Sequence, residues 1–526
     1  MIQAPSALRS ALTVSAVRIL NMLLFLVLGV MSAAYFGTSM QKDCYLVAQT
    51  IPGLLTTFLI GGVYSSLLVV LSEIGARHGL DAQIAFTRST MTQLILLLLP
   101  FLLLTFAIPH AIVGLLAPGL GGERLELSGR LLQVTAGSAV LAMCLSVTRC
   151  MYETRLQFFV PCTLTLLVPF FSLVVMVTLV DMAGIFTLAW GPLLGTAATL
   201  GLLHLLARRV LRDPAGFVPI LARSEERREW RRRFWISLMP LSIGGNVGQV
   251  NLLVDNAFAS YLPVGSIAAL GFAFVLVSNL RQLTVGTLAE VALPRMAAAT
   301  RGDPSELREK VRWTMRHMVL ITTPLTAGAL AFGVPTVRLL FQRGEFTPQD
   351  TERVATLLAF YAPELTLTGC IAAMTLVLLV RRRFALLAWT SAGAMLANAL
   401  LDYILMGLIG VKGIALATSC TSLLYVLLLV PLIRREVSGI LGADDLRFLL
   451  KIFVCAAIMA LLSLSWAWVF EHLADPAWEM GRALEVGVGL ALGAVSYAGL
   501  LFLSDVTEAR ALLIRTLGRI PFLARS

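Results

Sequence analysis

Apolar stretches of about 20 residues recur along the whole chain, and they limit its possible folds more than any motif does. Each stretch is long enough to cross a lipid bilayer as a helix. The composition agrees, because 58% of the residues are hydrophobic, 13% are charged and the mean hydropathy is +0.86, far from a soluble average. The sequence therefore predicts an all-α integral membrane protein.

The apolar stretches divide into fourteen predicted transmembrane spans. A chain with so many spans and no large extramembrane domain is typical of a transporter. The predicted spans are 14–36, 44–72, 90–117, 131–149, 158–181, 184–206, 234–262, 264–294, 317–341, 354–380, 384–410, 412–433, 451–471 and 481–504.

The spans are expected to form two pseudo-symmetric lobes followed by two C-terminal helices. An ungapped superposition of the second span on the eighth pairs Gly61 with Gly286, as expected for the related halves of a secondary transporter. The predicted divisions are an N-terminal lobe at 1–206, a basic cytoplasmic linker at 207–233, a C-terminal lobe at 234–433, and the last two spans with a cytoplasmic tail at 434–526.

The net charge of +11 raises the question of a nucleic-acid partner, but the distribution of the charge argues against one. Most of the 41 Lys and Arg residues lie in the termini and in the loops that join an even-numbered span to the next odd one. By the positive-inside rule, both termini are then cytoplasmic. The linker at 207–233 alone carries nine arginines, which would attract anionic lipid headgroups.

Polar residues inside three spans form a candidate cation site. Asn398 and Asp402 are four residues apart and so share a helix face, while Thr418 lies in the next span and Asp255 in the seventh. Counted from the outer ends of their spans, Asp255, Asp402 and Thr418 lie roughly 9–12 Å deep at 1.5 Å per residue. Two buried carboxylates at one depth repel each other unless they share a cation or a proton. The alternative is an interhelical hydrogen-bond cluster.

Other polar residues are candidates for the lining of a central cavity. Arg18 in the first span either extends to the headgroups or faces a cavity, and Arg281 lies near the middle of the eighth span. The second span contains the helix breakers Pro52 and Gly53, followed by Thr56 and Thr57. Such breakers are typical of spans that bend or line a cavity, although a close-packed interface of small residues fits equally well.

Three segments resemble the MurJ/MviN family of lipid II flippases, which belongs to the multidrug/oligosaccharidyl-lipid/polysaccharide exporter superfamily. They are NLLVDNAFASYLPVGSIAAL, LLFQRGEFTPQDT and NALLDYILMGLIGVKGIALATS. The resemblance implies fourteen helices, a bacterial inner-membrane location, a monomeric transporter, and a lipid-linked glycan and membrane lipids as partners. It also implies a sodium ion held by Asp255, Asn398, Asp402, Thr418 and the backbone carbonyl of Ile414, with a proton as the alternative coupling ion.

The chain departs from the family where the family's cavity arginines would bind the pyrophosphate of lipid II. Thr56 and Thr57 stand in place of an arginine pair, and Val275 replaces another arginine. The resemblance thus leaves Arg18, Asp43, Thr56, Thr57 and Arg281 as the candidates for binding the substrate headgroup.

The sequence therefore predicts a flippase for lipid II or a related cell-envelope or exopolysaccharide precursor, which works by cation-coupled alternating access. A cation-coupled multidrug exporter of the same superfamily and a non-transporting scaffold are the alternatives. An enzyme is not expected, because the sequence contains no phosphate-binding loop, no metalloprotease helix and no nucleophile elbow.

Overall fold

The structure is a computed structural model of the chain, and it describes residues 4–213, 223–243, 247–300, 303–440, 442–473 and 479–508. Every regular element in these ranges is a helix, which confirms the predicted all-α fold. The chain divides into two compact units, 1–268 and 269–526.

In the described ranges, ten helices are long and apolar enough to cross a membrane, or eleven if one sharply bent pair counts as a span. Two of the ten have the length of two passes each, namely Met40–Ala107 with 68 residues and Phe159–Val210 with 52. The predicted span 234–262 includes residues 244–246, which lie outside the described ranges. The multi-pass architecture is therefore confirmed, and the count of fourteen spans stays a prediction.

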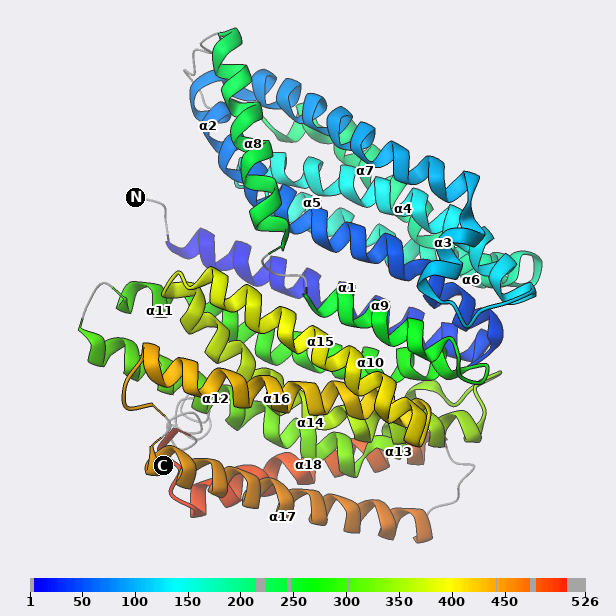
Figure 1. The fold of residues 1–526 in the computed structure, drawn as a ribbon, viewed down its shortest axis with the longest axis vertical. Helices are drawn as coiled ribbons and strands as arrows, with labels where there is room; N and C mark the ends of the chain where they lie inside the picture. Colours follow the sequence, from blue (N-terminus) through cyan, green and yellow to red (C-terminus); the bar gives the residue numbers. More distant parts are fainter. Residues whose placement is uncertain are drawn as a thin grey trace. The chain divides into compact units, whose positions relative to one another are not determined.

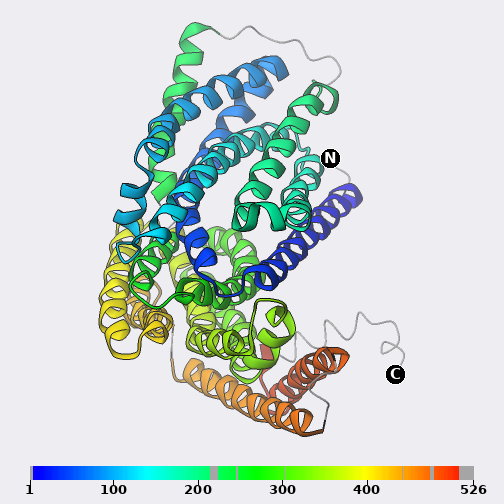
Figure 2. The same ribbon diagram turned by 90° about the vertical axis from the view of Figure 1, so that its right-hand side faces the viewer.

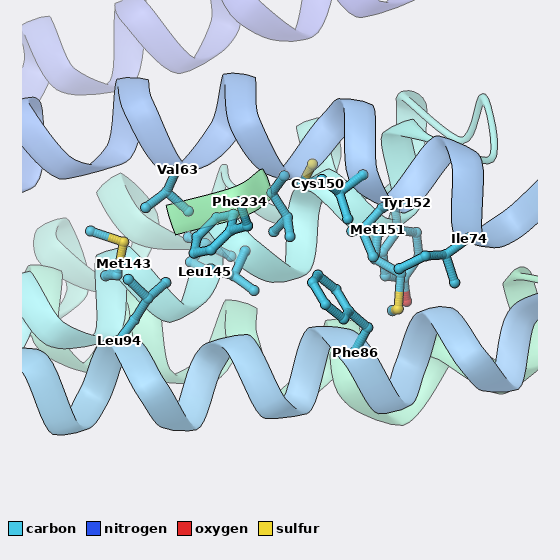
Figure 3. Packing of buried hydrophobic residues seen from close by; sticks show 14 of the residues in the cluster. Val63, Ile74, Phe86, Leu94, Met143, Leu145, Cys150, Met151, Tyr152 and Phe234 are labelled. Atoms are coloured by element: carbon cyan, nitrogen blue, oxygen red, sulfur yellow. The ribbon is translucent and has the colours of Figure 1, made fainter. Parts of the chain in front are cut away.

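The first unit is a bundle built around one long, broken helix (Figure 1). This helix, α2, packs against α4 and α8, and α4 packs against α7. Buried side chains from these helices, among them Leu94, Tyr152 and Phe234, form its hydrophobic core (Figure 3). The helices of the unit are α1 (Ala4–Phe36), α2 (Met40–Ala107), α3 (Pro109–Leu116), α4 (Glu123–Glu153), α5 (Phe159–Leu164), α6 (Leu167–Ala183), α7 (Thr187–Val210), α8 (Ser224–Ile243) and α9 (Val247–Ala259).

Helix α2 breaks at Gly79, which lies between two of the predicted spans. The backbone of Gly79 has φ 79° and ψ −171°, a conformation that side chains strongly disfavour. After the break, the amide of Leu80 donates to both carboxylate oxygens of Asp213, at 3.0 and 3.2 Å. Arg155 pairs with the same carboxylate at 2.9 Å. Asp213 thus supplies a cap from a distant part of the chain for the second half of α2.

Helix α8 belongs to the first unit, whereas the predicted division at 207–233 placed its hydrophobic half in the C-terminal lobe. The hydroxyl of Ser66 in α2 donates to the carbonyl of Phe234 at 2.9 Å, and Trp235 donates to Gln93 at 2.9 Å. Arg233 also pairs with Glu73 at 3.1 Å. These interactions hold α8 against both halves of α2, and the two compact units divide after Ala268. The predicted lobe boundaries stay a prediction.

The second unit is centred on α14, which packs against α12 and α16. The two C-terminal helices, α17 and α18, pack against each other (Figure 2). The helices are α10 (Ser266–Arg281, whose first three residues fall in the first unit), α11 (Thr287–Ala299), α12 (Pro304–Ala331), α13 (Gly333–Phe341), α14 (Pro348–Val380), α15 (Phe384–Ile409), α16 (Val411–Glu436), α17 (Ala443–Leu473) and α18 (Glu479–Leu503), with a π-helical turn, η2 (Gln282–Gly286), between α10 and α11.

The LLFQRGEFT segment forms the turn between α13 and α14. Its Phe341 and Phe346 are buried with Phe272 of α10, with ring centres 5.1 to 5.8 Å apart. The backbone of Gly344 has φ 55°, and Thr347 forms a capping box that begins α14. The motif therefore fixes the entry of α14.

Candidate functional site

Arg281 forms an ion pair with Glu364 inside the second unit. Its Nη1 atom donates to Glu364 Oε1 at 2.7 Å, and its guanidinium carbon lies 5.6 Å from the centre of the Phe274 ring. Thr368, one turn along α14, donates to the same Glu364 oxygen at 3.3 Å. The Arg281 side chain is 34% exposed and the Glu364 side chain only 6%. An anion could therefore reach the guanidinium, whereas Glu364 lies behind it.

Glu364 was not predicted from the sequence, although a signal was present. It is an acidic residue within the predicted span 354–380, directly after Pro363. An ionisable residue within a membrane span is by default a functional candidate, and its partner has to be named. The structure supplies this partner from a helix more than 80 residues away in the chain.

Asn398 and Asp402 contact each other, as their spacing predicts. Asn398 Nδ2 donates to Asp402 Oδ2 at 2.7 Å, and both side chains are buried. Thr418 donates to the carbonyl of Ile414 at 3.3 Å on the neighbouring helix α16. The four residues thus lie on one helical hairpin, α15–α16, and all bear oxygen atoms suited to a hard cation.

The hairpin is tight because glycines occupy its turn. Gly410 joins the two helices with φ 63°. A Cβ atom on Gly413 would lie 2.2 Å from the carbonyl oxygen of Leu405, so only glycine allows this approach. Asp402 is one turn before Leu405, and Thr418 is just over one turn after Gly413. The antiparallel pairing therefore places these two residues at a similar level, in agreement with their predicted depths.

Asp255 lies in α9 of the first unit and is buried. Its neighbour Asn256 donates to Thr50 of α2 at 2.8 Å, which fixes this face of α9 against α2. The other four proposed ligands belong to the second unit. The common sodium site of all five residues stays a prediction.

Asp43 accepts two short hydrogen bonds from backbone amides. Its carboxylate oxygens bind the amide of Gly265 at 2.6 Å and that of Ala268 at 2.7 Å, and the side chain is fully buried. These amides belong to the start of α10, where backbone N–H groups lack partners within the helix. In the structure Asp43 therefore caps α10, and its predicted contact with substrate remains untested.

Thr56 and Thr57 both direct their hydroxyl groups to their own helix. Thr56 donates to the carbonyls of Pro52 and Gly53, each at 2.9 Å, and Thr57 donates to Gly53 at 2.8 Å. Because Pro52 has no N–H, it cannot donate the usual helical hydrogen bond to the carbonyl of Ala48. The hydroxyl of Thr135 donates to this carbonyl instead, at 3.0 Å. The two predicted headgroup ligands thus satisfy the backbone around a proline.

Arg18 is exposed on α1. Helix α1 packs against α5, where the thiol of Cys162 donates to the carbonyl of Val14, one turn before Arg18, at 3.9 Å. Arg149 pairs with Glu153 at 3.2 Å, and Tyr64 of α2 donates to Glu153 at 2.5 Å. The first unit thus contains the charged pair Arg149–Glu153, which was not predicted from the sequence, and the role of Arg18 in the headgroup site stays a prediction.

Comparisons with known proteins agree on one family. The model of the family described as "Lipid II flippase MurJ" matches residues 32–489. The chain is 24% identical over 507 residues to the lipid II flippase MurJ of Burkholderia cenocepacia, which covers 94% of this chain and 96% of that protein. It is 25% identical over 396 residues to the probable lipid II flippase MurJ of Thermotoga maritima, with 75% and 78% covered.

Solved structures show the same fold. A lipid II flippase MurJ in an inward closed conformation matches with a TM-score of 0.74 at 20% identity, covering 96% of this chain and 99% of that one. An inward-facing multidrug resistance MATE family transporter of the MOP superfamily matches with a TM-score of 0.63 at 14% identity, covering 80% and 96%.

Proposed function

Because this chain belongs to the MurJ lipid II flippase family, we propose that it exports a polyprenyl-pyrophosphate-linked glycan across the bacterial inner membrane. The glycan is lipid II or a related cell-envelope precursor, and both termini of the transporter are cytoplasmic. The chain is a multi-pass membrane transporter of this family and not an enzyme.

The observation that carries the substrate class is the position of Arg281. It is a permanent cation in the predicted eighth span, and a third of its side chain is exposed. A pyrophosphate entering a region of low dielectric needs a cationic partner, and a guanidinium can hold a phosphate through two parallel hydrogen bonds. An organic cation, the substrate type of a multidrug exporter, would be repelled by this residue.

The proposed transport cycle is alternating access. The headgroup binds through its phosphates to the guanidinium of Arg281, while the polyprenyl tail remains in the bilayer among the membrane lipids. A lysine at this position would supply the charge but not the planar pair of donors.

The proposed coupling ion is Na⁺, held by Asp402, Asn398, Thr418 and the Ile414 carbonyl, with Asp255 as the fifth ligand. The buried oxygen donors of the α15–α16 hairpin fit a hard cation. When bound, the ion offsets one of the two carboxylate charges and leaves the site with one net negative charge. Its inward movement down about 100 mV releases roughly 2.3 kcal/mol, enough to shift a two-state equilibrium substantially. A shared proton is the alternative.

The test is complementation of a bacterium depleted of its lipid II flippase. The wild-type chain should sustain growth if lipid II is carried, Arg281→Ala should abolish it, and Arg281→Lys should retain part of it. The exposed Glu290→Gln is a matched control in the neighbouring helix and should behave like wild type. Full activity of Arg281→Ala would refute the headgroup assignment. Failure of the wild-type chain itself, with normal membrane expression, would exclude lipid II and leave a related precursor.

A further inference from the structure

We propose that Glu364 is the internal counter-ion of Arg281, and that the substrate phosphate replaces it while Glu364 takes up a proton. This exchange rests on the proposed function, since it concerns the same arginine. It assigns a new residue to the binding site and gives substrate binding a proton stoichiometry.

The geometry leaves part of the guanidinium available for an anion. Glu364 is bound through Nη1 alone, and the other N–H groups of Arg281 have no hydrogen-bond partner among the described residues. The ring of Phe274 lies against the guanidinium and limits where it can move. The π-helical turn that begins at Gln282 directly follows Arg281, and such turns are frequent at functional sites.

Glu364 is placed so that it cannot remain ionised alone. Its Oε1 atom is held by Arg281 and Thr368, while its Oε2 atom is buried and has no hydrogen-bond partner among the described residues. If Arg281 turned to a phosphate, Glu364 would keep only the hydroxyl of Thr368. A buried carboxylate that loses its counter-charge is strongly disfavoured, so it takes a proton from the aqueous side.

The charges balance in this exchange. The guanidinium–carboxylate pair breaks, the guanidinium–phosphate pair forms, and an O–H bond forms on Glu364. No oxidant, reductant or leaving group is needed. Compared with the free protein, the substrate-bound protein holds a phosphate group on Arg281 and one additional proton on Glu364.

The helices packed against α14 bring hydroxyls close to this part of it. Thr326 of α12 donates to the carbonyl of Ala362 at 3.0 Å, and Ser419 of α16 donates to that of Phe360 at 2.6 Å. Neither hydroxyl titrates near neutral pH.

The titratable groups on these packed helices are bound elsewhere or lie near helix ends. His317 of α12 is bonded to the Trp313 carbonyl, Asp402 of α15 to Asn398, and Glu290 of α11 is exposed. Near the middle of α12, Arg316 pairs with Asp445, and Arg295 of α11 lies over the Trp313 ring. The remaining charged residues of α12 and α16 lie nearer the ends of these helices. Arg281 is thus the charged partner that Glu364 would lose.

The experiment is calorimetric titration of the full-length protein in detergent with farnesyl pyrophosphate, in two buffers of different ionisation enthalpy. At pH 8 a phosphate whose second pKa is near 6 is already deprotonated, so proton uptake reports on the protein. Wild type should take up about one proton per ligand, and Glu364→Gln about none. Glu364→Gln should also bind about tenfold more tightly, since it lacks the internal competitor, and Glu290→Gln should match wild type.

The outcomes separate this exchange from the proposed function. Binding by wild type without proton uptake overturns the exchange alone, and this result does not depend on the folding of any variant. Weaker binding by a folded Glu364→Gln, or unchanged proton uptake, also overturns it. If wild type does not bind farnesyl pyrophosphate at all, the proposed function fails and the exchange fails with it.

Discussion

The capping role of Asp43 leads to a prediction that separates structure from transport. Replacing Asp43 with alanine would leave the buried amides of Gly265 and Ala268 without the acceptors that now lie at 2.6 and 2.7 Å. A hydrogen bond to a charged acceptor contributes about 1.5–3 kcal/mol, and an unsatisfied buried donor costs about 1–3 kcal/mol. Because the two losses overlap, we expect Asp43→Ala to destabilise the protein by about 3–5 kcal/mol. Asp43→Asn keeps one acceptor oxygen and should lose about half as much.

The assay is thermal unfolding of the purified protein in detergent, compared with binding of farnesyl pyrophosphate below the melting temperature. The capping role predicts a lower melting temperature and unchanged affinity in Asp43→Asn. A direct role in binding the headgroup predicts an unchanged melting temperature and a weaker affinity in Asp43→Asn. Asp350→Asn serves as the control, because it weakens an exposed cap at the start of α14 and should cost much less. An unchanged melting temperature in Asp43→Ala would refute the capping argument.

Three further predictions concern other parts of the molecule. Gly413→Ala should destabilise the protein by about 1–3 kcal/mol, because its methyl group meets the Leu405 backbone, and a melting curve equal to wild type would contradict this. Burial raises the pKa of Glu508, but the hydrogen bond and charge of Arg316 lower it more, so the pKa is lowered overall. Glu508→Gln should therefore reduce the melting temperature at pH 7, and the reduction should shrink as the pH falls below 4.5, because the wild-type carboxylate then becomes protonated. At equal ionic strength, wild type should melt at a higher temperature in Na⁺ than in K⁺, whereas Asp402→Asn should melt at the same temperature in the two salts. If wild type and Asp402→Asn respond equally to Na⁺, this sodium site is excluded.

The sequence was sufficient to predict the features that depend on local spacing. The apolar stretches predicted the helices, and the interval of four residues between Asn398 and Asp402 predicted the contact that the structure contains. The glycines at 410 and 413 predicted the hairpin turn between two spans. Each of these follows from helix geometry alone.

Pairings between distant segments could not be predicted in the same way. The hydrogen bond of Ser66 to Phe234 holds α8 in the first unit, yet nothing local distinguishes this serine from others in apolar spans. Arg281 was identified as a cation within a span, but its partner Glu364 lies 83 residues away on α14, and this pairing depends on tertiary packing. Polar residues in a span can also bind substrate, another helix or their own backbone, and Asp43 shows that a charged residue can cap a helix more than 200 residues away.

The hydroxyls of Thr56 and Thr57 are already bonded within their own helix, so they are poor ligands for an anion. Each hydroxyl has one proton and donates it to a backbone carbonyl of α2. Phosphate oxygens only accept hydrogen bonds when ionised, so neither threonine can bind them without giving up its bond to the helix. In the proposed function the cationic partner of the phosphates is Arg281, which already pairs with Glu364. A substrate must outcompete this carboxylate, and a pyrophosphate does so better than a monophosphate because it carries more negative charge.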